Sequence, residues 1–445
     1  MKRLFLSLAF VVIHCSFSVA QKAIYIPEDL RAMNMDSDTS QWCWKRSAET
    51  RDLIFLWERG FGNDLQSPPP LEGKPMAFNL SVLMERVQSF YTFFRDTLGF
   101  VKNPSPITQH PSPITHHPTP NTHHPTPITH HPSKADRYKM MVMVMYSLDG
   151  TAYGGTYDDF IGALWVAPNR IQDKTMNCMA HELGHSFQLQ IPADSVGDAW
   201  GGTGFYEMTS QWMLWQVNPW WLRDENYHFE AFKELTHRAF LHMDNIYHSP
   251  YVIQWWSDLH GRQSIAELYR HGRIGEDPVI TYKRLYGLSQ SDFCDEMLRG
   301  YQHLMNFDFH HARTETRPYA CTFSCQLDTL RGGWMKPVNM PEDYGFNAIA
   351  LPPVSKTRID LKGQDVRYAF VGITTDGESL YGDIGQPLFV CPKGKQLAHL
   401  YLVVMGAPTE HRQLYPHHPT PITHHPTPIT HHPSPSTYSY QFRIR

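Results

Sequence analysis

Apolar positions follow two different periodicities, and the change between them divides the chain. Up to about residue 318, several segments repeat apolar residues every three or four positions, which is typical of amphipathic helices. The clearest such helix is predicted over 79–100, where seven apolar side chains share one face. From about residue 319, apolar and polar residues alternate, which predicts β-strands. The pattern therefore predicts an α+β protein, with a mixed region at 21–318 and a small, sandwich-like all-β region at 319–445.

Shorter patterns fill in both regions. Continuous apolar runs predict buried strands at 52–58, 138–147 and 161–167, and the glycines of "GGTYDD" predict a turn before the third strand. Further helices are predicted at 175–190, 205–216, 227–241, 251–260, 264–271, 277–286 and 289–306. In the last region, strands are predicted at 347–353, 357–363, 366–377, 398–408 and 437–445.

A proline-rich unit of seven residues, HPTPITH, interrupts the chain at 103–133 and again at 416–436. Proline at two of every seven positions excludes a helix or a central strand and predicts an extended linker. These two stretches hold 13 of the 27 histidines. Their His-His pairs are open to two interpretations, weak metal capture or expansion of a short DNA repeat into surface loops. Recurrence of one unit in two unrelated settings favours the second.

The first twenty residues have the pattern of an export signal. Lys2 and Arg3 precede an apolar run, and Ser18-Val19-Ala20 gives a small-x-small cleavage site. We therefore expect cleavage near Ala20 and a secreted, periplasmic or cell-surface protein, without a later transmembrane segment. A formal charge of −4 gives no reason to expect a nucleic-acid partner. Six cysteines follow the signal; neither their pairing nor the oligomeric state can be predicted from the sequence.

The candidate chemistry lies in "NCMAHELGHSFQLQ", residues 177–190. His181 and His185 are four residues apart, so on a helix both face the same side and can bind one metal ion. Glu182, between them, is placed to take a proton from a metal-bound water. In a chain with 27 histidines such a motif also arises by chance, so the interpretation depends on a third ligand.

The third ligand is predicted to be a carboxylate from the next helix. The long metzincin motif is excluded because Gln188 and Ile191 occupy its required glycine and histidine positions. Glu207 lies 22 residues after His185, just inside a predicted helix, and a glycine-rich loop lets that helix fold back. Asp194 and Asp198 are closer in sequence and remain alternative ligands or supporting carboxylates.

His181, Glu182, His185 and Glu207 resemble the gluzincin pattern of thermolysin-like zinc metallopeptidases. Together with "GGTYDDFIGALWVAPNR" and "YEMTSQWMLWQ", they also resemble an uncharacterised family of secreted bacterial zincin-like proteins. The resemblance implies a zincin-like catalytic domain at 21–318 with an active-site helix pair, bound Zn²⁺, and a peptide or glycoprotein substrate.

The same resemblance implies two further features of the cleft. A strand is expected to run above the zinc helix and to pair with an extended peptide, and 161–167 is the candidate. A donor to the transition state is also expected, and Tyr247, His248 and Tyr251 are the candidates. The sequence does not choose among them, and each is equally well explained as a surface or packing residue.

The sequence therefore predicts an exported zinc metallohydrolase, a peptidase with Glu182 as general base. The alternative belongs to another class: a non-catalytic surface protein that binds glycans or glycoproteins on a zincin-like scaffold. The two hypotheses differ in whether Glu182 must act as a base, because a binding protein does not need one.

Overall fold

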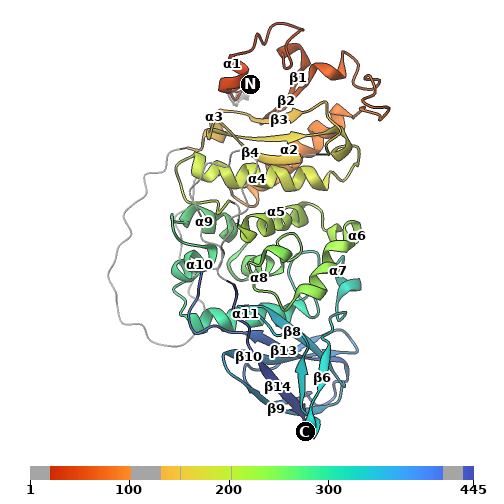
Figure 1. Ribbon diagram of the computed structural model, residues 1–445, viewed down its shortest axis with the longest axis vertical. Coiled ribbons are helices and arrows are strands. Elements are labelled where there is room, and N and C mark those ends of the chain that lie inside the picture. Colours follow the sequence, from red (N-terminus) through yellow and green to blue (C-terminus); the bar gives the residue numbers. More distant parts are fainter. Residues whose placement is uncertain (1–20, 102–131, 151, 202, 414–433) are drawn as a thin grey trace, which may run out of the picture.

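The computed structural model describes residues 21–101, 132–150, 152–201, 203–413 and 434–445. The predicted export signal and most of both proline-rich repeats lie outside these residues. The fold is mixed α+β, as predicted. Along the long axis of the molecule, a mixed sheet is followed by a helical layer and then by two further sheets (Figure 1).

The helices are α1 (Glu28–Arg31), α2 (Leu80–Asp96), α3 (Lys134–Arg137), α4 (Asn177–Ala193), α5 (Gly204–Val217), α6 (Trp221–Asp224), α7 (Asn226–Leu235), α8 (Tyr251–His260), α9 (Ser264–His271), α10 (Pro278–Tyr286) and α11 (Gln290–Leu304). The strands are β1 (Ser47–Glu49), β2 (Leu53–Trp57), β3 (Met140–Val144), β4 (Ala152–Tyr157), β5 (Ile161–Val166), β6 (Leu327–Thr329), β7 (Met335–Pro337), β8 (Phe346–Leu351), β9 (Lys356–Gly363), β10 (Val366–Thr374), β11 (Ser379–Tyr381), β12 (Leu388–Val390), β13 (Leu397–Gly406) and β14 (Tyr440–Ile444).

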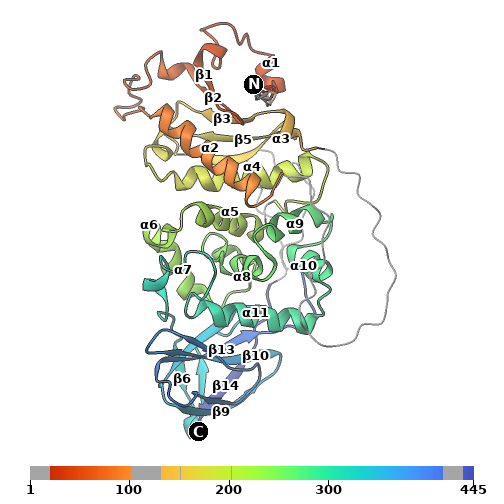
Figure 2. The same ribbon diagram turned by 180° about the vertical axis from the view of Figure 1, so that it is seen from behind.

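The first sheet has the strand order β1-β2-β3-β5-β4. Its three central strands are parallel, and the two edge strands β1 and β4 are antiparallel to their neighbours. β3 and β5 are buried along their whole length, because both faces of the sheet are covered. α2 and α4 pack on one face (Figure 2), and the N-terminal segment with α1 and Trp42 covers the other.

The structure corrects the prediction of a turn at "GGTYDD". Residues 152–157 form β4, which pairs with β5 along its whole length, and the turn comes only at Asp158 and Asp159. Adjacent glycines are uncommon in strands and suggest turns, but here they mark a close approach to another backbone. β5 therefore lies inside the sheet, and β4 is the edge strand.

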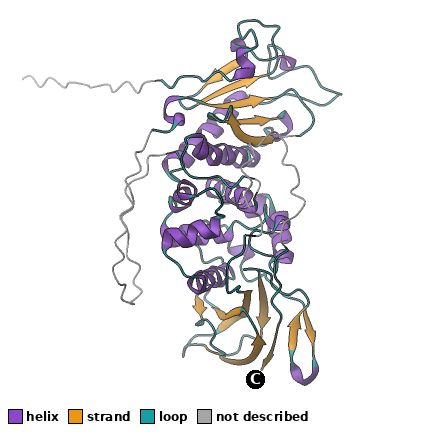
Figure 3. Ribbon diagram, turned by 60° about the vertical axis from the view of Figure 1, so that its left-hand side comes forward, coloured by secondary structure: helices purple, strands orange, loops and turns teal. Residues whose placement is uncertain are grey.

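Figure 3 shows the helical layer between the sheets. Its helices bury many aromatic side chains. Trp215 and Trp221 are fully buried, whereas Trp220 is exposed. α7 is shorter than its predicted range of 227–241. The chain after it bonds instead to residues 342–346, for example from Phe346 N–H to the Thr236 carbonyl.

The last region consists of two antiparallel sheets, β11-β10-β13-β8 and β12-β9-β14-β7-β6. Apolar side chains from both sheets form a shared core that includes Phe370, Leu402 and Phe442. The face of the β11-β10-β13-β8 sheet that points away from this core packs on α11. There the Tyr301 and Phe346 rings stack with centroids 4.1 Å apart. The five longest strands of this last region are those that the alternating pattern predicted.

Two other sequence questions have partial answers. All six cysteines after the signal are free thiols in the structure. Within the described ranges, no helix is long and apolar enough to cross a membrane.

One buried carboxyl in the helical layer has an unusual pKa. Glu296 in α11 accepts a hydrogen bond from the Tyr282 hydroxyl of α10. Burial raises the pKa of Glu296 to about 7, although this hydrogen bond opposes the shift. An unfolded chain would titrate the same group at about 4.3. Between these two pH values the folded state holds a proton that the unfolded state has lost.

We predict that this group lowers the stability of the protein as pH rises from about 5 to 8. Above the raised pKa, folding must keep a charged carboxylate buried, so the stability present at low pH is lost. Glu296→Gln cannot ionise and still accepts from Tyr282. The free energy of unfolding in urea should be higher for the variant than for wild type at pH 8 but not at pH 5. Glu85→Gln, at an exposed position, is the control and should show no such difference. An equal difference at both pH values would contradict the prediction.

Candidate metal centre

The motif-bearing helix α4 is held between the first sheet and α5. Its apolar residues Met179, Leu183 and Phe187 are fully buried against both. The turn spacing of four residues places His181 and His185 on one face, with their ring centroids 4.6 Å apart. They are nearly buried, with 9% and 5% of each residue exposed.

Helix α5 brings the third group. α4 and α5 approach closely at Gly184, where an added Cβ would lie 2.5 Å from the Ser210 hydroxyl. That hydroxyl in turn donates a hydrogen bond to the His181 carbonyl. This contact aligns the first turn of α5, and with it Glu207, against the two histidines. A side chain at position 184 would separate the helices, and such overpacking typically costs about 1–3 kcal/mol.

Three side-chain atoms converge at this point. Glu207 Oε2 lies 3.1 Å from His181 Nε2 and 3.1 Å from His185 Nε2, and the two histidine nitrogens are 3.0 Å apart. This is the one group of three or more His, Cys, Asp or Glu side chains in the described ranges that could hold a metal ion. The predicted third ligand, Glu207, therefore lies where the sequence placed it.

Two glutamines fix the orientation of the histidine rings. Gln211 Nε2 donates to the backbone carbonyl of Tyr247, which can only accept, so its Oε1 faces His181 Nδ1 at 2.9 Å. Gln188 Nε2 likewise donates to the Tyr206 carbonyl, so its Oε1 faces His185 Nδ1 at 2.8 Å. Both Nδ1 atoms must then carry protons.

Because each Nδ1 is held by its glutamine, Nε2 of each ring is the nitrogen that faces Glu207 and that can bind a metal once it carries no proton. This is the arrangement that a metal needs from histidine ligands. The sequence analysis missed the two glutamines in this role. Gln188 follows His185 by three residues and Gln211 follows Glu207 by four, so helical spacing alone would have marked both as facing the site.

Glu182 lies beside this group but is not part of it. Its Oε2 accepts a hydrogen bond of 2.8 Å from the Gly154 N–H of β4. Any side chain at position 154 would overlap the Glu182 carbonyl, so glycine is required for β4 to lie against α4. The edge strand and the candidate base are thus joined directly.

The charges of the site perturb one another. Burial lowers the pKa of His181, but the hydrogen bond to Glu207 and the charge of Glu182 outweigh burial and raise it to about 9. Burial raises the pKa of Glu207, but the two histidines outweigh that effect and lower it. The pKa of Glu182 is raised by burial, against the opposing charges of both histidines. A metal bound here must therefore displace a proton from His181.

The alternative carboxylates are not at the site. Asp194 follows the end of α4 and accepts from the Ser133 hydroxyl, the Lys134 N–H and the Gln190 amide. It therefore anchors the segment that follows the first repeat. Asp198 is buried in the glycine-rich loop and accepts from the Trp200 N–H. Neither belongs to the convergent group.

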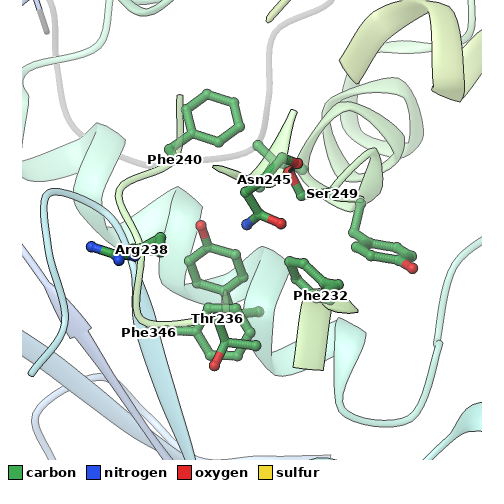
Figure 4. A pocket seen from close by; sticks show the side chains of 10 residues that line it. Phe232, Thr236, Arg238, Phe240, Asn245, Ser249 and Phe346 are labelled. Carbon is green, nitrogen blue, oxygen red and sulfur yellow. Dashed lines mark hydrogen bonds between the residues drawn. The ribbon is translucent and has the colours of Figure 1, made fainter. Parts of the chain in front are cut away.

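The three donor candidates have different surroundings. Tyr247 is 41% exposed, its ring centroid is 5.9 Å from that of His181, and burial together with the charge of Glu207 raises the pKa of its hydroxyl. His248 Nδ1 lies 2.7 Å from His228 Nδ1. Tyr251 is 2% exposed and lines a cavity of about 10 Å³ with Phe232 and Phe346 (Figure 4). The structure therefore places Tyr247 beside the group and Tyr251 in the core.

The expected substrate strand must also be corrected. The segment 161–167 is bonded on both sides, by β3 and by β4, so its backbone is not free to pair with a peptide. β4 is the edge strand and packs directly on α4. The sequence pointed to the wrong strand because β4 was interpreted as a turn.

The site thus belongs to the class of two-histidine, one-carboxylate groups able to hold a metal ion. The sequence matches the family of unknown function DUF6055 over residues 16–122 and 124–443. The match covers most of the chain, so the protein belongs to this family. No curated protein matches the sequence.

We predict that stoichiometric metal binding depends on the convergent group. His185→Ala and Glu207→Ala each remove one ligand and should abolish zinc retention after dialysis against a weak chelator, as measured by elemental analysis. Asp194→Ala removes only hydrogen bonds and should keep the zinc while lowering the melting temperature. The assignment would be contradicted if His185→Ala kept its zinc. It would also be contradicted if Asp194→Ala lost zinc while Glu207→Ala kept it.

Proposed function

We propose that the protein is a zinc-dependent metallohydrolase that cleaves peptide bonds, with His181, His185 and Glu207 as ligands. The observation that carries the proposal is the convergence of these three ligand atoms beside an unliganding Glu182. We place the activity outside the cytoplasm because residues 1–20 have the pattern of an export signal.

Zinc is the proposed metal on two grounds. Zinc ligands lie about 2.0–2.2 Å from the ion, and tetrahedral angles then separate neighbouring ligand atoms by about 3.3 Å. The measured separations of 3.0 and 3.1 Å are close to this value. Two imidazoles and one carboxylate are also the ligands of many catalytic zinc sites, which leave a fourth position for water or substrate.

When bound, zinc supplies a Lewis acid and lowers the pKa of a bound water. The residues of the chain supply the rest. Glu182 takes the proton of the attacking water and delivers it to the leaving amine. Its raised pKa favours this role because a more basic carboxylate takes up a proton more readily. The Gly154 N–H holds its carboxylate in place.

The remaining roles fall to Tyr247 and β4. Burial and the carboxylates of Glu207 and Glu182 raise the pKa of Tyr247, so its hydroxyl keeps the proton that it would donate to a developing oxyanion. Apart from the Gly154 N–H, which bonds Glu182, the backbone groups of β4 that do not pair with β5 face the outer edge of the sheet, where an extended peptide can add as a further strand. These features support the resemblance to gluzincins and to a zincin-like domain.

We predict that Glu182→Gln lowers turnover by about 10²–10⁴, the usual effect of removing a general base. The glutamine oxygen can still accept from Gly154, so zinc content and melting temperature should hold. A digest of a peptide and glycopeptide library, wild type against variant, makes the measurement. If neither protein cleaves anything but both retain a common glycan or glycoprotein ligand, the binding-protein alternative is the better account.

We predict that Tyr247→Phe and Tyr251→Phe behave differently. The first removes the proposed donor and should lower kcat by about 10²-fold, with KM and zinc content little changed. The second removes a buried hydroxyl that has no hydrogen-bond partner, so kcat should be unchanged and stability equal or higher. A normal kcat for Tyr247→Phe would show that the donor lies elsewhere.

A further inference from the structure

A chain of hydrogen bonds leads from the metal-binding group to a histidine outside it. His181 Nδ1 bonds Gln211 Oε1 at 2.9 Å, and Gln211 Nε2 lies 3.3 Å from His228 Nε2. His228 Nδ1 lies 2.7 Å from His248 Nδ1. The four side chains come from α4, α5, α7 and the turn before α8.

The direction of every bond in this chain is fixed. The Tyr247 carbonyl accepts from Gln211 Nε2, so that amide nitrogen also donates to His228 Nε2. His228, accepting at Nε2, must carry its proton on Nδ1 and donate it to His248. His248 must then accept at Nδ1, which leaves its own proton on Nε2.

The surroundings keep both outer histidines neutral. Burial, with the charges of His248 and His181, lowers the pKa of His228 to about 3, and burial lowers the pKa of His248. The charged group nearest His228 is Glu225, 3.8 Å from Nε2, beyond hydrogen-bond distance. Glu225 instead accepts from the Trp221 indole and the Asn177 amide.

We propose that His228 and His248 are positioning residues, which act through Gln211 to keep the proton of His181 on Nδ1 and its Nε2 free for the metal. The inference rests on the metal-binding function proposed above and extends it to regulation of that site. Any change that makes position 248 a donor reverses the chain.

The reversal follows step by step. A donor at position 248 forces His228 to accept at Nδ1 and to carry its proton on Nε2, opposite the Gln211 amide N–H. Gln211 relieves this conflict by turning its amide over, which gives up its hydrogen bond to the Tyr247 carbonyl and presents NH₂ to His181 Nδ1. His181 must then carry its proton on Nε2, the atom that the metal requires.

Three variants at position 248 of the full chain separate this role from packing. His248→Asn places an acceptor oxygen near the position of Nδ1, His248→Leu removes the acceptor, and His248→Lys supplies only donors. Met243→Lys adds the same charge at an exposed position of the preceding turn and is the matched control. Zinc affinity is measured for each by competition with a chromophoric chelator at one pH.

Zinc affinity should fall in the order wild type, Asn, Leu, Lys. We expect the Asn variant to lie within about threefold of wild type and the Lys variant to be weaker by at least about tenfold, the scale of losses around metal-bound histidines. Met243→Lys should match wild type. Equal losses in the Asn and Lys variants, or a Met243→Lys loss as large as that of His248→Lys, would overturn the proposal.

A double-mutant cycle tests the route through Gln211. Gln211→Glu keeps an acceptor for His181 and can also accept from a reversed His228. His248→Lys should therefore cost little further zinc affinity in the Gln211→Glu background. An unchanged tenfold loss there would show that the effect does not pass through Gln211, and would overturn the proposal.

A readout that needs no metal separates this inference from the proposed function. In chelator-treated protein with ¹⁵N-labelled histidine, nitrogen shifts should show His228 neutral and protonated on Nδ1. Protonation on Nε2 would overturn the chain whether or not zinc binds. Wild-type protein that binds no zinc would instead contradict the metallohydrolase, while the proton position of His228 still decides the inference.

Discussion

The close packing of α4 against α5 is the constraint on which the rest of the site depends. The two helices meet at Gly184, where the Ser210 hydroxyl occupies the space of a missing side chain and bonds the His181 carbonyl. This approach brings Glu207 to within 3.1 Å of both histidine nitrogens. The buried charges stabilise each other only in this arrangement, because an unpaired carboxylate here would cost several kcal/mol.

The edge strand β4 is tied to the same helix by a second close approach. With no side chain at position 154, the strand backbone reaches α4 and donates its N–H to Glu182. Gly154 therefore holds the candidate base, and Gly184 allows the helix contact that aligns the candidate ligands. In the proposed mechanism a peptide paired with β4 lies in fixed register with Glu182. Binding along β4 can therefore orient the scissile bond.

Much of this organisation could be predicted from the sequence. The patterns in the sequence predicted α2, α4, α5 and the long strands of the last region. α2 buries one regular face, whereas α4 and α5 are buried on nearly all sides. The spacing of His181 and His185 placed both on one helix face because helical geometry is local, and Glu207 of the next helix converges with them in the structure. Metal binding by the three stays a prediction. β4 was missed because Gly154 and Gly155 have the composition of a turn, and their value as strand residues appears only against α4. Helical spacing marks Gln188 and Gln211 as facing the site, but their orientation depends on the carbonyls of Tyr206 in α5 and of Tyr247 before α8, which spacing does not show.

At the proposed site two imidazoles and one carboxylate hold the metal, and the thirteen histidines of the proline-rich repeats take no part. X-ray absorption at the zinc edge, on full-length protein loaded with one equivalent, tests this most directly. We predict a first shell of about four ligands with scattering from two imidazoles. A shell dominated by three or four imidazoles, unchanged when His181 and His185 are both replaced, would place the metal in the repeats and contradict the account.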